Sequence, residues 1–172
     1  MGGTIVQQIA YQHPQRVLSV TISNSFCKIS TIFLLYSKAR EKFMELNIPK
    51  QTIIESILPW VFSSGYLAQD NRIEELTQLF SSNPFPITEI GYRNQLQALA
   101  SFDSTSWIHK IAVPCLFIAG EEDIIAFADT VKTMAKQVVD STFFCIPKVG
   151  HVPHIENPKL FNQIVYQFIA SR

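Results

Sequence analysis

An aspartate and a histidine in the C-terminal third of the chain stand where catalytic side chains are expected. Asp123 follows an apolar, strand-like run at residues 115–119, and His151 follows another at residues 142–146. In a parallel sheet, functional groups gather beyond the carboxyl ends of the strands. A histidine there removes the proton of a nucleophile, and a carboxylate fixes its tautomer and stabilises the imidazolium. The two residues therefore predict the acid and the base of nucleophilic catalysis.

Other acids near Asp123 offer alternatives. Glu121 and Glu122 directly precede it, and Asp129 follows it at the start of a predicted helix. The segment Gly-Glu-Glu-Asp is also favourable turn chemistry, which gives Asp123 a purely structural interpretation. The residue pattern by itself leaves these alternatives open.

Three further histidines have simpler interpretations. His154 forms a His-x-x-His pair with His151, but no Cys, Glu or third His lies at ligand spacing, so we predict no metal site. We expect His154 to brace the loop instead. His13 and His109 are predicted to lie on the surface, beside the ends of elements.

The chain opens with Met1, two glycines and an amphipathic helix whose apolar residues recur at helical spacing. In a nucleophile elbow, a serine occupies a tight turn between a strand and a helix. Small residues follow the serine so that the helix can pack closely. Met1, Gly2 and Gly3 have the pattern of the residues directly after such a serine.

These segments together resemble the α/β-hydrolase superfamily, most closely its cap-bearing branch of small esterases, enol-lactonases and carbon–carbon bond hydrolases. The strongest stretches are VPCLFIAGEED at residues 113–123 and VGHVPHIENP at residues 149–158. The resemblance covers nearly the whole chain, as the C-terminal part of a longer family member. One departure is Phe127, which stands where the family often has a proline.

The resemblance implies roles for individual residues. Asp123 and His151 become the acid and base of a triad, and the serine nucleophile would lie just before Met1, outside the sequence. If a serine preceded it, the backbone N–H of Met1 would be one donor of the oxyanion hole. Acyl transfer by such a triad requires neither metal nor nucleotide, so we expect no cofactor.

The order of predicted elements gives an α/β fold. Strands at 17–22, 115–119 and 142–146 alternate with helices, which indicates a parallel sheet covered on both faces. Residues 29–99 have a helical pattern throughout, with three to five short helices. We therefore predict an incomplete α/β-hydrolase core at residues 1–28 and 108–172, with an inserted all-helical cap at residues 29–107.

Composition sets the broad class and the partners. Lys and Arg balance Asp and Glu at 14 each, which gives no electrostatic reason to expect nucleic acid or an anionic membrane. The apolar run at residues 32–36 is too short to cross a bilayer, and no leader pattern opens the chain.

The cysteines point to a reducing compartment. Cys27, Cys115 and Cys145 cannot all pair with one another, and we expect Cys115 and Cys145 to be small hydrophobes in core strands. A reduced, cytoplasmic setting follows. None of the three stands beside a helix N-terminus, where a thiol pKa would be lowered, so we predict no cysteine nucleophile.

The predicted function is cleavage of a small, largely apolar ester, lactone or diketone by a serine hydrolase of which this chain is the C-terminal part. The aromatic content of residues 29–107 suits such a substrate. Two alternatives stay open: a relative with an aspartate nucleophile, and a non-catalytic remnant or interaction module. A sheet lacking its N-terminal strands would expose an edge, so we expect instability, self-association or pairing with a complementary N-terminal chain.

Overall fold

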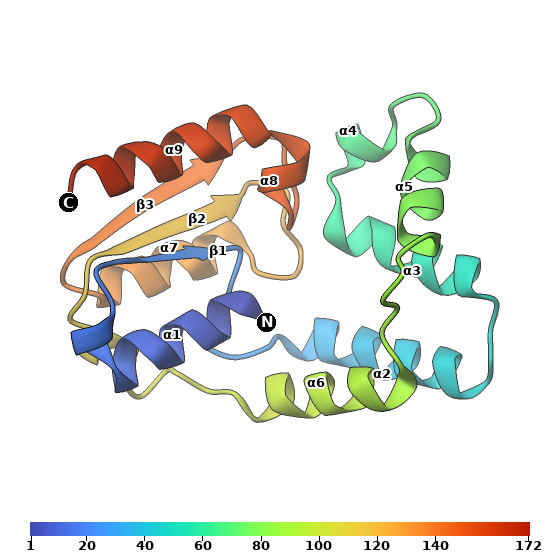
Figure 1. Cartoon of the computed structure of the whole chain (residues 1–172), viewed down its shortest axis with the longest axis horizontal. Helices are drawn as coiled ribbons and strands as arrows, with labels where there is room; N and C mark the ends of the chain where they lie inside the picture. The colour runs from blue at the N-terminus through green and yellow to red at the C-terminus, as the bar shows by residue number, and fades with distance from the viewer.

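The computed structural model describes all 172 residues and contains one three-stranded parallel sheet (Figure 1). The strand order is β1 (Val20–Ser23), β2 (Cys115–Gly120), β3 (Ser141–Ile146). Both neighbouring pairs are parallel, and the register places Cys115 between Val20 and Ser141. The predicted parallel α/β architecture is confirmed.

Helices cover both faces of this sheet. Helix α9 (Pro158–Ala170) lies on one face, where Ile164 and Phe168 pack on Leu116 and Ile118. Asn157 caps this helix by accepting a hydrogen bond from the backbone N–H of Leu160 at 3.2 Å. The elements on the other face are α1 (Gly2–Gln12), η2 (Ile108–Lys110) and α7 (Ala128–Gln137).

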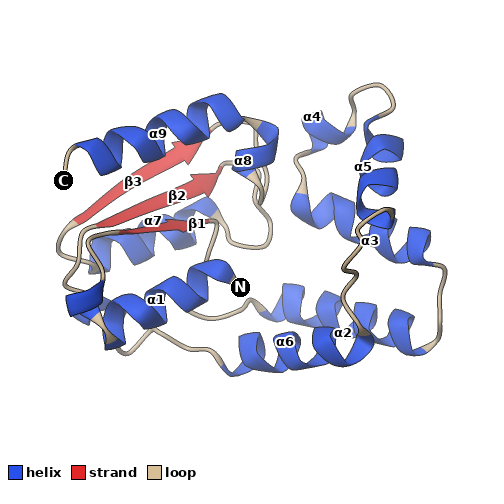
Figure 2. Cartoon of the chain, viewed as in Figure 1, coloured by secondary structure: helices blue, strands red, loops and turns tan.

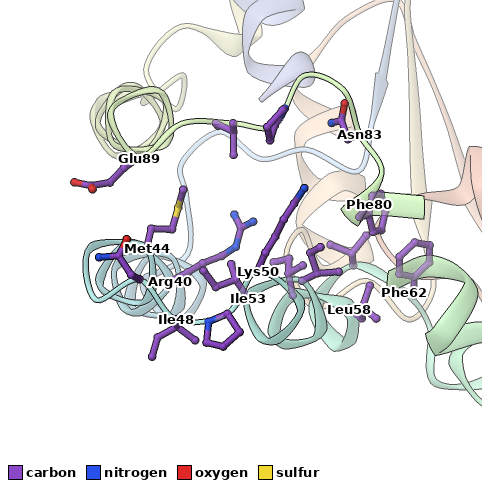
Figure 3. Close-up of a pocket in the computed structure, with 17 residues that line it drawn as sticks. Arg40, Met44, Ile48, Lys50, Ile53, Leu58, Phe62, Phe80, Asn83 and Glu89 are labelled. Atoms are coloured by element: carbon purple, nitrogen blue, oxygen red, sulfur yellow. The ribbon is translucent and has the colours of Figure 1, made fainter. Parts of the chain in front are cut away.

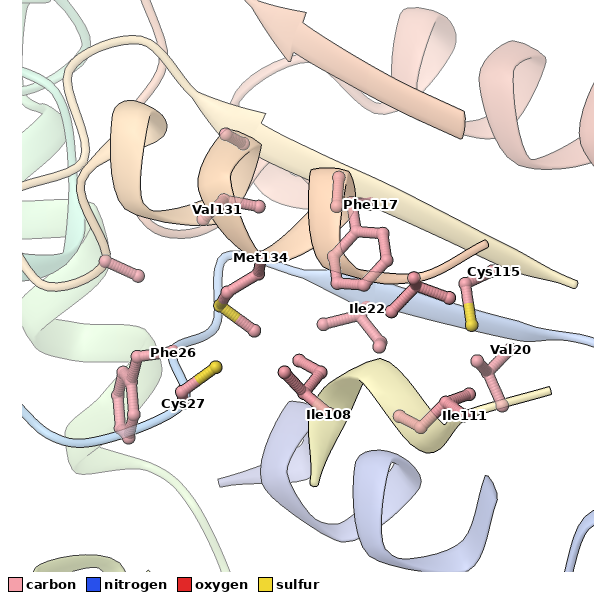
Figure 4. Packing of buried hydrophobic residues seen from close by; sticks show 14 of the residues in the cluster. Val20, Ile22, Phe26, Cys27, Ile108, Ile111, Cys115, Phe117, Val131 and Met134 are labelled. Atoms are coloured by element: carbon pink, nitrogen blue, oxygen red, sulfur yellow. The ribbon is translucent and has the colours of Figure 1, made fainter. Parts of the chain in front are cut away.

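The main core lies between the sheet and this second layer (Figure 4). Ile22 and Phe117 are fully buried at its centre, and Val131 and Met134 from α7 pack over them. Every residue of β2 is buried, because β2 is the middle strand and has helices on both faces. The continuous apolar run that predicted this strand reflects that position.

The chain between β1 and β2 is helical (Figure 2). It contains five helices, in agreement with the three to five expected: α2 (Thr31–Glu45), α3 (Lys50–Val61), α4 (Ser64–Leu67), α5 (Arg72–Ser81) and α6 (Glu89–Ser101). Aromatic stacking joins α2 to α3, since the Tyr36 and Trp60 rings lie 4.6 Å apart. We call residues 29–107 the helical segment.

Two local expectations are wrong. The first strand begins at Val20, because Pro14–Arg16 forms a 3-10 turn and Leu18 is 94% exposed on the approach to the sheet. Cys145 is exposed, although it lies in a strand. The reason is that β3 is an outer strand, and the helix layer covers only part of its length.

The short α8 (Pro153–Glu156) precedes α9 and completes the loop after β3. None of the helices combines the length and the apolar character needed to traverse a membrane.

Candidate active site

Asp123 is buried just beyond β2, with 2% of its surface exposed. Its Oδ1 accepts hydrogen bonds from the backbone N–H groups of Ile125, at 2.8 Å, and Ala126, at 3.0 Å. Its Oδ2 accepts one from the side-chain amide of Asn24, at 2.8 Å, and lies 2.9 Å from Nδ1 of His151. A buried charge is tolerable only when it is paired and hydrogen-bonded, and this carboxylate is fully satisfied.

His151 follows β3 and remains partly accessible, with 24% of its side chain exposed. An ionised carboxylate only accepts hydrogen bonds, so the Asp123 contact assigns the proton of the neutral ring to Nδ1. Nε2 then carries the free lone pair, as a general base requires. The backbone N–H of His151 donates to the carbonyl of Val61 at 2.8 Å, which fixes the loop against the helical segment.

Two glycines allow the loop after β3 to pack closely, one against the loop after β2 and the other against the helical segment. A Cβ on Gly120 would lie 2.0 Å from the carbonyl oxygen of Gly150. A Cβ on Gly150 would lie 2.8 Å from the backbone nitrogen of Ser63. Both contacts are shorter than any side chain allows, so both positions require glycine. The first close approach brings the histidine loop to the loop of Asp123, and the second packs the histidine loop against the helical segment.

Asn24 is a site residue that sequence analysis missed. It directly follows β1, is buried, and has a left-handed backbone with φ 47°. Its amide donates to Asp123 and also to the carbonyl of Gly150, at 3.1 Å. Asparagine adopts this conformation more readily than most residues. The position of Asn24 just after a strand, at the same sheet edge as Asp123, was the one signal that could have found it.

Glu156 was also missed. Its carboxylate accepts a hydrogen bond from the backbone N–H of Gly150 at 2.8 Å, and from both the backbone N–H and the hydroxyl of Ser63. It therefore fastens the histidine loop to the helical segment. The sequence around Glu156 gave little indication of this role, because a glutamate just before a helix is commonly exposed to solvent.

The first turn of α1 lies at the same end of the sheet (Figure 1). A Cβ on Gly3 would lie 2.5 Å from Cβ of Ser25, so the small residue is needed for this close packing. Met1 caps the helix with its carbonyl, which accepts from the backbone N–H groups of Thr4 and Ile5. Partial burial lowers the pKa of the Met1 amine.

The rival acids and histidines lie outside this arrangement. Glu121, Glu122 and Asp129 are exposed, and Glu121 accepts from the backbone N–H of Lys148 at 3.0 Å. His154 is exposed and its ring lies 5.8 Å from that of Phe161. His13 and His109 are on the surface. The structure contains no group of three or more His, Cys, Asp or Glu side chains placed to hold a metal ion.

The thiols are poorly suited to act as nucleophiles. Burial raises the pKa of Cys115 to about 12, with the charge of Asp140 adding to the effect. Burial also raises the pKa of Cys27 and of Cys145. Since the thiolate is the reactive form, these shifts lower the reactivity of all three.

Comparison with known proteins identifies the fold family. A family model described as "alpha/beta hydrolase fold" matches residues 1–158. The 3-oxoadipate enol-lactonase 1 of Acinetobacter baylyi is 27% identical over 171 residues, which span 99% of this chain and 62% of the relative. A Bacillus subtilis protein provisionally named 2-succinyl-6-hydroxy-2,4-cyclohexadiene-1-carboxylate synthase is 26% identical, over 99% of this chain and 64% of its own.

A solved structure gives the same fold. The enol-lactonase from Burkholderia xenovorans LB400 superposes with a TM-score of 0.84 at 20% identity, covering 99% of this chain and 63% of that one. This chain therefore spans slightly under two thirds of the length of the relatives that it matches.

Proposed function

Because this chain belongs to the α/β-hydrolase fold family, we propose that it supplies the acid, Asp123, and the base, His151, of a serine-type hydrolase. The observation that carries the proposal is the 2.9 Å contact between His151 Nδ1 and the buried carboxylate of Asp123. It leaves Nε2 of the partly exposed ring free to accept a proton. In an ion pair on the surface, neither partner is buried, whereas here the carboxylate is buried and the histidine ring remains partly accessible.

The proposed reaction proceeds in two acyl-transfer steps. His151 Nε2 takes the proton of a serine hydroxyl as the oxygen attacks the substrate carbonyl carbon. The buried carboxylate of Asp123 stabilises the imidazolium, which then gives the proton to the leaving group. A water molecule, activated by the same nitrogen, hydrolyses the acyl-enzyme and restores the serine.

We place that serine directly before Met1, in a segment outside these 172 residues. Two features support this placement. The first turn of α1 lies at the sheet end where Asp123 stands, so a preceding residue would be close to the site. The Met1 nitrogen would then be an amide, available as an oxyanion-hole donor.

The second feature is the outer edge of β1. Val20 and Asn24 donate backbone hydrogen bonds to Pro114 and Ile118, at 3.0 and 2.8 Å, so the alternate residues Thr21 and Ser23 direct their backbone groups away from β2. We propose that a strand leading to the serine pairs with this edge. Self-association through the same edge is the competing outcome.

The substrate class we propose is a small, largely apolar ester, lactone or diketone. The helical segment, which we take as a cap, contacts the histidine loop through Val61 and Ser63 and carries an apolar cavity. The enol-lactonase among the relatives agrees with this class.

The test uses the protein with its preceding segment, a fluorophosphonate probe and hydrolysis of p-nitrophenyl butanoate. Labelling of a serine before Met1 is expected, and an aspartate nucleophile would not label. His151→Asn should lower kcat/KM about 10⁴-fold. His154→Asn, an exposed histidine three positions away, should change it less than about 2-fold.

Two results would contradict the proposal. Full activity of the His151→Asn variant would remove the histidine from the mechanism. A folded, complete protein that neither labels nor hydrolyses any ester would favour a non-catalytic remnant.

A further inference from the structure

The helical segment forms an open, largely apolar cavity of about 670 Å³ (Figure 3). It lies between α2, α3 and the connection from α5 to α6, and Met44, Ile48, Ile53 and Phe80 contribute to its wall. Pockets for small molecules typically measure about 300–1,000 Å³ and combine apolar walls with a few polar groups. The cavity therefore has the size and lining of a ligand site.

The polar group that stands out in this wall is Arg40, on α2. Its Nε is fully buried without a hydrogen-bond partner. Its guanidinium carbon lies 4.8 Å from the centre of the Tyr92 ring. Arg72 also has a buried Nε without a partner, but both of its terminal nitrogens are hydrogen-bonded, and Arg93 binds three carboxylates. Arg40 forms no ion pair, and its two terminal nitrogens make no hydrogen bond within the protein. These terminal donors, rather than the buried Nε, remain available to a ligand.

The remaining charges at the cavity favour an anion. Lys50 extends toward the same space as Arg40 (Figure 3), and its ammonium donates to the carbonyl of Ser81 at 2.7 Å. An ammonium has three donors, so two are left. Glu89 lines the cavity, but Arg93 holds its carboxylate at 2.7 Å. The cavity thus presents two cations and one acid that is already paired.

We propose that this cavity binds a small molecule with an apolar body and a carboxylate, which the guanidinium of Arg40 binds. A guanidinium fork matches the two oxygens of a carboxylate, and stacking on Tyr92 holds the fork in place. Attraction between the charges is strengthened by the apolar surroundings. Inorganic phosphate lacks the apolar body that the walls would bury.

The cavity also borders the candidate active site. Val61 and Phe62 line it, and the Val61 carbonyl accepts the hydrogen bond from the backbone N–H of His151. A substrate bound in this cavity would therefore lie next to the histidine loop. Together with the proposed function, on which this step rests, the cavity limits the substrate class to an ester or lactone that carries a free carboxylate. The binding proposal itself requires no catalysis.

Calorimetric titration of the protein with its preceding segment tests the proposal with 4-phenylbutanoate and its neutral amide. The carboxylate should bind at least about 10-fold more tightly than the amide. Arg40→Met should lower the affinity for the carboxylate about 10-fold or more and leave that for the amide unchanged. Arg40→Lys, which keeps the charge without the fork, should give an intermediate value.

Lys38→Met is the matched control, because Lys38 is exposed on the same helix and does not line the cavity. It should bind the carboxylate as the unmodified protein does. Equal affinity for acid and amide, equal weakening by the Lys38 and Arg40 variants, or binding of inorganic phosphate as tight as that of the carboxylate would overturn the proposal. Failure of hydrolysis would not, since no bond is broken in the titration.

Discussion

Asp123 and Arg40 are both charged and partly or fully withdrawn from solvent, yet their surroundings differ. The carboxylate of Asp123 has four hydrogen-bond partners, drawn from three separate parts of the chain. The Nε of Arg40 has no partner in the protein. The strand-end site is therefore built to hold one geometry, whereas the cavity of the helical segment leaves its charge free for a ligand.

The difference agrees with the requirements of each task. Catalysis needs a base oriented to within a fraction of an ångström, which only a fully bonded, rigid surrounding provides. Recognition instead needs donors that remain unpaired until the ligand arrives. The same contrast predicts that substitutions at the strand ends destabilise more than matched substitutions in the helical segment.

The largest effect is expected from Gly120→Ala. The new Cβ would lie 2.0 Å from a backbone carbonyl, so the loops after β2 and β3 must separate. The free energy of unfolding should fall by about 3 kcal/mol or more. Gly65→Ala in α4 meets no atom within 4 Å and should leave stability unchanged or raise it by up to about 1 kcal/mol. Urea unfolding measures both, and equal losses would contradict the contrast.

A smaller loss is expected from Asn24→Gly. Glycine keeps the left-handed backbone but removes the amide that bonds Asp123 and Gly150. Stability should fall by about 2 kcal/mol, and kcat/KM of the complete protein should fall as well. Asn71→Gly is the control, because Asn71 has φ 58°, is exposed and should change by only a few tenths of a kcal/mol. Similar losses for the two variants would show that the amide contributes little.

The contact between the histidine loop and the helical segment should contribute less free energy than either of the losses above. Glu156 and Ser63 join the histidine loop to the helical segment through a carboxylate–hydroxyl hydrogen bond. A double-mutant cycle with Glu156→Gln and Ser63→Ala should give a coupling free energy of about 1 kcal/mol, measured by urea unfolding. Strictly additive effects would mean that the two regions are energetically independent at this contact.

The smallest consequence concerns the thiols. With a pKa near 12, Cys115 stays protonated at pH 8, and the thiolate forms only as the pH approaches that value. Iodoacetamide at pH 8 should therefore modify exposed Cys145 first and leave Cys115 untouched in the folded protein, without loss of stability. Mass spectrometry identifies the modified residue. Early modification of Cys115 would show that the core strand opens.

Much of the fold was predictable because its signals are local. The apolar run of β2 and the helical pattern between the strands were both recognised from short windows. The errors arose where position in the sheet decides. Cys145 is exposed because β3 is an outer strand, and residue pattern does not reveal which strand is outermost.

The sequence by itself determined the order of strands and helices and placed Asp123 and His151 directly after strands, because turn and strand signals act over a few residues. Only the tertiary structure decided which groups form hydrogen bonds to Asp123 and to the loop of His151. Asn24 lies 99 residues from Asp123, and Ser63 lies 93 from Glu156, so no local pattern links either pair. It also decided that Arg40 forms no ion pair and leaves its Nε without a hydrogen bond, because such a charge is recognised only when all its neighbours are in place.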